Sequence, residues 1–280
     1  MRKIMAIAVV AVSISAVWPA AAQTSFTDFS STAGLQINGD AYQNGNKLTL
    51  TPALVGQHGS AFSLNRISLA SNTSFSTFFS FEILDRGGIP GYGINGADGI
   101  TFTMQTVASN VGGGGGGIGY EGIDHSVMVE FDTYNNGEAG GSNHVAINTN
   151  GVMADLVTTP ELSPDFDLGD KWYAWVDYNG ATQSLDARWS QTTARPALSM
   201  LHAILDLPTI LGRPDVFAGF TSGTGAGWGQ HNLLSWNFVN SFQEGGAPPP
   251  STVPEPGTLI LLATGLGMTM FGRKLVRRGK

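Results

Sequence analysis

The stretch SVMVEFDTYNNGEAGGSNHVAIN, from Ser126 to Asn148, decides the fold because it holds two strand-like segments joined by a polar, glycine-rich loop. In the first segment apolar residues alternate with polar ones, which is the period-two pattern of a half-buried strand. In the second segment, which starts at His144, Val145 and Ile147 alternate in the same way. If the two segments pair across the loop, they form antiparallel neighbours that share one apolar face.

The opposite face of this strand pair carries Glu130 and Asp132, and pairing would bring His144 beside them. Two close carboxylates repel each other, so one pKa would rise unless a cation lay between them. Oxygen ligands with one imidazole suit Mn²⁺ or a similar transition metal, and oxygen ligands alone suit Ca²⁺. Asn136 and the carbonyl of Tyr134 could supply oxygens to a second ion. The residues alone leave open a metal site and a pair of solvated acids.

The same alternation recurs through the body of the chain, from Thr24 to Phe242. About a dozen strand-like runs are separated by clusters of Gly, Asn, Asp and Pro, and only residues 197–211 could hold a helical turn. The 280 residues include 38 glycines and no cysteine, which excludes disulfide scaffolds and cysteine-based zinc sites. The pattern predicts an all-β fold with two antiparallel sheets stacked face to face.

The net charge of the chain limits which classes of binding partner are compatible with it. The body carries 7 basic and 19 acidic residues, a net charge of −12, within a chain of formal charge −7. A surface of that sign repels phosphate backbones, so the composition argues against nucleic-acid binding. It suits an extracellular protein or one that binds cations.

The N-terminal residues 1–22 are typical of a secretory signal peptide, expected as a signal helix. Arg2 and Lys3 precede an apolar run, and the small residues Ala20-Ala21-Ala22 follow it, so cleavage is expected before Gln23. A buried N-terminal strand or helix is the alternative.

The C-terminal residues carry a second targeting pattern. Residues 244–252 form a Gly/Pro linker that we expect to be too stiff and polar for a core. Residues 253–280 contain the motif VPEP, an apolar segment at about 257–272 and a basic end. This tail resembles the PEP-CTERM sorting signal of exopolysaccharide-producing Gram-negative bacteria. The resemblance implies transient inner-membrane anchoring by a short hydrophobic helix, cleavage by an exosortase-type protease, and a final place outside the cell or on its surface. A plain C-terminal anchor is the alternative.

An enzyme interpretation starts from the same acids, because some jelly-roll glycosidases place two Glu on one strand face with an Asp between them. Here Tyr134 and Asn135 follow Glu130-x-Asp132, so the second acid is missing locally. The six consecutive glycines 112–117 lack the Gly-Lys-Ser/Thr ending of a phosphate loop. They fit either a flexible surface loop or a backbone that approaches a ligand closely.

Four blocks of sequence resemble legume-type (L-type) lectins in the order in which that family has them. VMVEFDTYNN…NHVAIN resembles the family's metal-binding signature. The other blocks are ADGITFTMQ (Ala97–Gln105), GGGGIGY (Gly114–Tyr120) and VFAGFTSGTGAGWGQHNLLSWNF (Val216–Phe238). The resemblance implies a jelly-roll sandwich over residues 23–243, an exported lectin that recognises glycan or exopolysaccharide with metal and without catalysis. The alternatives are a structural cell-surface or matrix protein with this fold and a jelly-roll glycoside hydrolase. The oligomeric state also stays open, with a homodimer as one possibility.

The resemblance also implies a role for individual residues. Asp98 would accept hydrogen bonds from sugar hydroxyls after a cis Ala97–Asp98 peptide, and Asn136 would bind the sugar and Ca²⁺ together. A loop from Gly223 to Gln230, with Trp228 at its tip, would set specificity. The implied carbohydrate-binding residues are Asp98, a backbone N–H of Gly116 or Gly117, Asn136, Gly227 and Trp228.

Two metal sites are implied in the same way. The Ca²⁺ ligands would be Asp132, the carbonyl of Tyr134 and Asn136, and the Mn²⁺ ligands would be Glu130, Asp132 and His144. The family has a second Asp about five residues before the histidine, where this chain has Ala139 with Glu138 beside it. Ca²⁺ is therefore expected, and Mn²⁺ or another transition metal stays open.

Overall fold

The computed structural model describes residues 23–69, 72–89 and 95–250. The expected signal peptide, the VPEP motif and the apolar C-terminal segment lie outside these residues. Among the residues described, no helix is long and apolar enough to cross a membrane.

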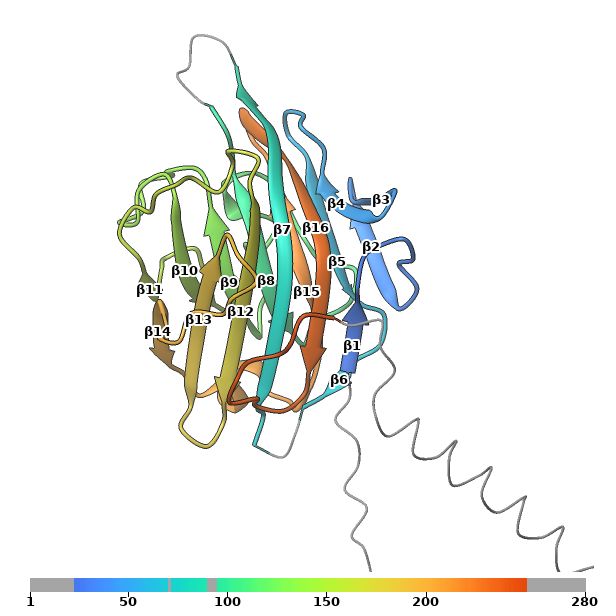
Figure 1. Ribbon diagram of the computed structural model, residues 1–280, viewed down its shortest axis with the longest axis vertical. Helices are drawn as coiled ribbons and strands as arrows, with labels where there is room; N and C mark the ends of the chain where they lie inside the picture. Colours follow the sequence, from blue (N-terminus) through green and yellow to red (C-terminus); the bar gives the residue numbers. More distant parts are fainter. Residues whose placement is uncertain (1–22, 70–71, 90–94, 251–280) are drawn as a thin grey trace, which may run out of the picture.

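The chain forms two antiparallel sheets stacked on each other, as the alternating pattern predicts (Figure 1). We call them the back sheet and the front sheet. The back sheet has the strand order β14 (Leu201–Ile204), β13 (Ser184–Ser190), β12 (Lys171–Asn179), β7 (Phe75–Gly88), β16 (Gly227–Val239), β4 (Lys47–Thr51) and β3 (Tyr42–Asn44), with β1 (Gln23–Phe26) also paired to β16. The front sheet has the order β11 (Val157–Thr158), β10 (His144–Thr149), β9 (Ser126–Asp132), β8 (Gly99–Gln105), β15 (Asp215–Gly223), β5 (His58–Ser63) and β2 (Leu35–Gly39), with β6 (Ile67–Ser68) beside β15.

Helical structure in the described residues is confined to two short pieces. The helix α1 (Leu207–Leu211) lies inside the segment 197–211 that was expected to hold a helical turn. It begins with the side chain of Asp206 accepting a hydrogen bond from the N–H of Thr209, and it ends at Gly212 in the left-handed conformation, where glycine costs least. The 3₁₀ turn η1 (Gly115–Gly117) lies in the glycine run.

The core lies between the two sheets and is rich in aromatic rings. Phe79 of the back sheet packs edge-on against Phe131 and Phe220 of the front sheet, with ring centroids 5.8 and 5.0 Å away. Each large apolar side chain that is fully buried stabilises the fold by about 1.5–3 kcal/mol. The apolar members of each alternating strand therefore hold the sandwich together and fix which side chains face outward.

The outer face of the front sheet is not solvated, because loops cover it. All seven residues of β9 are buried, the polar ones included. Tyr120 and Ile123, from the loop after the glycine run, pack with Met128 of β9 in a small apolar cluster. The Tyr120 hydroxyl accepts hydrogen bonds from the Ser126 hydroxyl and the Gly151 N–H, which fixes two loops above the strands. The acids of β9 consequently lie in a covered site.

The outer face of the back sheet is covered in part by the chain's own C-terminal segment. This segment, orange-red in Figure 1, crosses β7 and β12 after leaving β16. Ala247 is 1% exposed and packs against Phe78 and Trp175, and the Asn237 amide donates to the Pro248 carbonyl at 2.7 Å. Residues 244–250, expected to be too polar for a core, thus lie against the domain because one small apolar side chain enters a gap between aromatic rings.

Candidate functional site

Strand register gathers the predicted metal ligands. Asp132 of β9 pairs with Gly99 of β8 on one side and with His144 of β10 on the other. Paired residues point to the same face of a sheet, so the Asp132 and His144 side chains point to the same side of the sheet. The Thr133 N–H donates to the Asp98 carbonyl at 3.0 Å, which fixes Asp98 at the start of β8 beside them. The prediction that Glu130, Asp132 and His144 converge is confirmed.

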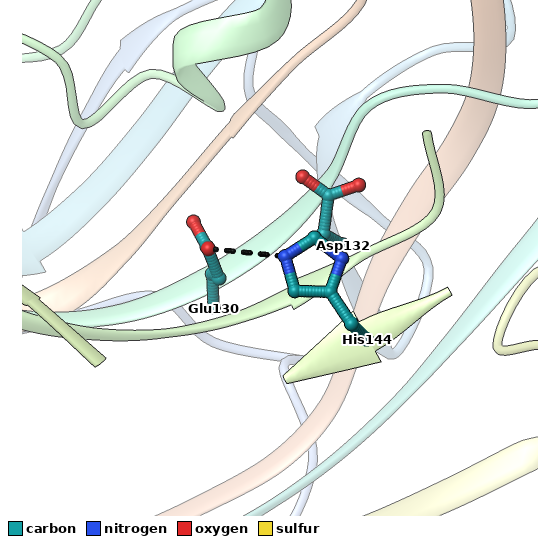
Figure 2. A group of neighbouring side chains, drawn as sticks. All are labelled: Glu130, Asp132 and His144. Atoms are coloured by element: carbon teal, nitrogen blue, oxygen red, sulfur yellow. Dashed lines mark ion pairs between the residues drawn. The ribbon is translucent and has the colours of Figure 1, made fainter. Parts of the chain in front are cut away.

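Glu130, Asp132 and His144 offer three ligand atoms that all lie within 4.8 Å of one another, and all three residues are buried (Figure 2). The Nε2 atom of His144 lies 3.5 Å from Oε1 of Glu130. The Nδ1 atom lies 3.2 Å from the carbonyl of Gly141, which can only accept, so Nδ1 carries a proton. This contact directs Nε2 toward the acids and sets the tautomer that a metal-binding histidine needs.

Burial changes the pKa values of all three side chains. It raises the pKa of Glu130 to about 7, against the lowering effect of the nearby His144 imidazole. Burial and then the charge of Glu130 raise the pKa of Asp132 well above its usual range. Burial would lower the pKa of His144, but the facing carboxylates of Glu130 and Asp155 outweigh it and raise that pKa.

Several buried polar atoms of this cluster have no hydrogen-bond partner: Oε2 of Glu130, Nε2 of His144 and Oδ2 of Asp155. An unpaired buried polar atom costs about 1–3 kcal/mol, and more when it is charged. A divalent cation removes that cost, because it neutralises the carboxylates and accepts the imidazole lone pair. The donor set of carboxylates and one imidazole therefore fits a bound metal ion, and a pair of solvated acids is wrong for these residues.

Asp98 lies next to this cluster with its own unsatisfied oxygen. The Ala97–Asp98 peptide is cis, as expected. Asp98 is 3% exposed, and its Oδ2 atom has no partner. Burial first, and then the charge of Glu138, raise the pKa of Asp98 to about 7, against a hydrogen bond from the Gly225 N–H. The carboxylate is thus held beside a backbone turn with one acceptor atom still to be satisfied.

The glycine run lies close to Asp98, because Gly115 packs against Gly223, whose carbonyl accepts a hydrogen bond from the Asp98 N–H at 3.1 Å. A Cβ on Gly116 would lie 2.7 Å from the Asn136 amide nitrogen, so only glycine allows this approach of backbone to side chain. Asn136 is exposed. Gly117, the other predicted donor, lies against the side chain of Glu121 instead. Gly116 is therefore the member of the pair that borders Asn136.

Comparison with known proteins agrees with this arrangement. Residues 21–254 match the legume lectin domain, and residues 252–278 match the PEP-CTERM protein-sorting motif. The chain belongs to the legume lectin domain family. Favin of Vicia faba is 30% identical over 223 residues, covering 74% of this chain and 89% of favin. The L-type lectin-domain containing receptor kinase VIII.1 of Arabidopsis thaliana is 32% identical over 193 residues, covering 64% of this chain and only 26% of the kinase.

Solved structures carry the same fold. The peanut lectin structure is 28% identical, with a TM-score of 0.62 over 78% of this chain and 97% of its own. The lectin from Bauhinia forficata in complex with GalNAc reaches a TM-score of 0.66 at 23% identity, over 79% of this chain and 98% of its own. The fold of this legume lectin domain thus matches these structures over nearly their whole length.

One predicted feature of this legume lectin domain is wrong. Strand β16 begins at Gly227, so the expected loop from Gly223 to Gln230 shrinks to the three residues between β15 and β16. Trp228 is a strand residue paired with Gly87 of β7, and its indole lies over that glycine, where a Cβ would come within 2.7 Å. Trp228 is therefore not at a loop tip, and Gly225 of the short turn contacts Asp98 instead.

Two acids outside the predicted ligand set also reach this site. Glu138, beside Ala139, accepts a hydrogen bond from the Asn136 N–H at 2.5 Å and raises the pKa values of Asp98 and Asp132 by its charge. Asp155 lies 3.7 Å from His144 Nε2 and escaped the sequence analysis altogether. No local motif marks it, because it comes from a loop that follows the second strand of the signature.

Proposed function

We propose that this legume lectin domain binds carbohydrate where Asp98, Gly116 and Asn136 gather at the end of the front sheet. The supporting observation is the buried Oδ2 atom of Asp98, which lacks a hydrogen-bond partner. Sugars carry neighbouring hydroxyls that donate to a carboxylate and accept from amide and backbone N–H groups. The Asn136 amide and the Gly116 backbone provide such donors, and the same glycine run packs at Gly115 against Gly223, whose carbonyl accepts from the Asp98 N–H.

We further propose that bound cations shape this site. Ca²⁺ would take Asp132, the Tyr134 carbonyl and Asn136, and a transition metal would take Glu130, Asp132 and His144. Buried carboxylates with raised pKa values and unsatisfied oxygens support this assignment. The Ca²⁺ would hold Asn136 toward the sugar, while Glu138 adds a second carboxylate near Asp98 and Asp132. Metal and sugar binding are then coupled through Asn136.

The test is a glycan array with three proteins, each with Ca²⁺ and Mn²⁺ or with EDTA. Hydrogen bonds to charged groups are worth about 1.5–3 kcal/mol, so Asp98→Asn should weaken glycan binding ten- to a hundredfold. Asp124→Asn is the matched control, because the Asp124 side chain is 70% exposed and contacts His125 rather than a predicted ligand. EDTA should abolish the signal of the wild type and of the control. Unchanged binding by Asp98→Asn would place the sugar elsewhere.

We propose that the chain acts outside the cell or on its surface. The sorting motif at residues 252–278 supports export with processing by an exosortase-type protease, after transient anchoring in the inner membrane. The same motif supports exopolysaccharide as the glycan encountered after release. The segment 244–250 covers part of the back sheet, so a homodimer through that face would need this segment to move.

A further inference from the structure

Asp155 reaches the metal cluster through the hairpin that joins β10 to β11. Ile147 of β10 pairs with Val157 of β11, so the chain turns back along β10 within a few residues. The Leu156 N–H donates to the Ile147 carbonyl at 3.0 Å and lies 3.3 Å from the Asn148 side-chain oxygen. These bonds tie the end of the loop to the strand that carries His144. Asp155 is thereby held beside the cluster rather than in a free loop.

The carboxylate of Asp155 faces the imidazole of His144. Its Oδ2 atom lies 3.7 Å from Nε2, which is also 3.5 Å from Oε1 of Glu130. The Asp155 side chain is only 10% exposed, and neither Oδ2 nor His144 Nε2 has a hydrogen-bond partner. Two acids thus lie near one ring nitrogen, at distances too long for hydrogen bonds.

These separations suit a metal ion placed between the donors. A transition metal lies ~2.1 Å from nitrogen and carboxylate ligands, which sets neighbouring donors ~3.0 Å apart in an octahedron and ~3.4 Å apart in a tetrahedron. The two observed separations, 3.5 and 3.7 Å, lie close to that range. Asp155 lies outside the group of three residues whose ligand atoms are all within 4.8 Å of one another, so its side chain would have to rotate inward to reach bonding distance.

The potential ligands are held by hydrogen bonds from neighbouring groups, as metal ligands in proteins usually are. The Asn148 amide lies 3.1 Å from Oδ1 of Asp155 and 3.4 Å from Oε1 of Glu130, so one side chain orients both acids. The Gly141 carbonyl accepts from Nδ1 of His144 and leaves Nε2 for the ion. Outer groups of this kind typically alter metal affinity 10- to 100-fold. Asp155 therefore has one unpaired oxygen near His144 Nε2 and its other oxygen held in place by Asn148.

We propose that Asp155 is a direct ligand of a divalent transition-metal ion held by Glu130, Asp132 and His144. This inference rests on the proposed cation site and adds a fourth protein ligand to it. It supplies from the β10–β11 loop a carboxylate that the loop before His144 lacks at Ala139. The resulting set of three carboxylates and one imidazole favours Mn²⁺, Co²⁺ or Zn²⁺ over Ca²⁺.

The experiment measures Mn²⁺ and Co²⁺ binding to the wild type and to Asp155→Asn, Glu130→Gln and the exposed control Asp124→Asn. Free Mn²⁺ is counted by its electron paramagnetic resonance signal, and Co²⁺ coordination is read from its visible absorption. Asp155→Asn keeps an oxygen that can accept from Asn148 but removes the charged donor. We expect the Mn²⁺ Kd to rise at least tenfold and the Co²⁺ spectrum to change. The control should match the wild type in both.

The outcomes separate this inference from the proposed function. If Glu130→Gln abolishes binding while Asp155→Asn keeps the wild-type Kd and Co²⁺ spectrum, the cation site stands and Asp155 is not a ligand. If Glu130→Gln binds like the wild type, the cation site itself is wrong, and the inference with it. Thermal melting in EDTA shows that each variant is folded; Asp155→Asn should melt no lower than the wild type, because it removes a charge from an acidic cluster.

Discussion

The stability of the metal-free protein should fall as the pH rises, because its buried acids hold protons more tightly in the folded state. Burial raises the pKa of Glu130 from an ordinary value of 4.5 to about 7. A group with a raised folded pKa contributes stability that is full below its unfolded pKa and is lost as the pH rises through the folded pKa. At about 1.4 kcal/mol per unit, Glu130 alone accounts for a loss of about 3 kcal/mol between pH 4.5 and 7.5.

Asp98, Asp132 and His144 also make the folded state less stable as the pH rises, because their folded pKa values are raised as well. Bound cations should reverse the trend. They require ionised carboxylates, and an ion that binds only the folded state at a hundred times its Kd adds about 2.7 kcal/mol. The gap in unfolding free energy between cation-loaded and EDTA-treated protein should therefore widen from pH 5 to pH 8.

Urea unfolding followed by tryptophan fluorescence, at several pH values with and without EDTA, measures this gap. A change of 3 kcal/mol corresponds to about 6–12 °C in Tm for a domain of this size. Glu130→Gln should reduce the loss of stability with rising pH in EDTA by about 3 kcal/mol. Glu244→Gln, the same substitution at an exposed position near the back sheet, should leave it unchanged. If the EDTA-treated wild type shows no loss, or Glu130→Gln loses as much as the wild type, the reasoning fails.

Three further predictions concern the sugar loop, the back sheet and the chain ends. Gly116→Ala places a methyl group within 2.7 Å of the Asn136 amide, so glycan binding on an array should drop while the circular dichroism spectrum stays native. Ala247→Asp puts a carboxylate into the apolar cluster on β7 and β12, so residues 244–250 should detach and be cut faster in limited proteolysis, without unfolding of the sandwich. Intact-mass analysis of protein released by its native host should show a chain that begins near Gln23 and ends near Val253; a full-length chain that stays in the membrane would contradict processing.

The sandwich could be predicted from sequence because its signal is local. Alternation in Phe75–Ile83 and in Val127–Phe131 places one set of side chains in the core, and the turn residues between runs mark where each strand ends. Pairing across the glycine-rich loop then follows from the short distance between the two halves of the signature. Glu130, Asp132 and His144 could be placed together on these grounds.

What the alternation could not predict is which polar faces are covered. Glu130 and Asp132 read as residues of a half-exposed strand, yet both are 1% exposed, because Tyr120 and Met128 pack over the same face. Whether a polar sheet face is buried depends on the loops that pack over it, and no periodic sequence pattern predicts the path of those loops. The same limit explains Trp228: the glycines around it look like a loop, but Gly229 packs closely against Ile83 of β7, and Gly87 of β7 leaves room for the indole.

Judged from the sequence alone, the absence of an acid at Ala139 suggests that the metal site has lost a ligand. In the folded chain a ligand can come from any segment that ends at the site, and the β10–β11 hairpin ends there because Leu156 bonds back to Ile147. Glu138 raises the pKa values of Asp98 and Asp132 by its charge, and Asp155 raises those of Glu130 and His144. So many buried acids repel one another unless cations lie between them. The acids that make the metal-free site unstable at neutral pH are thus the ones that would hold the ions, and carbohydrate binding at Asp98 should rise and fall with cation occupancy.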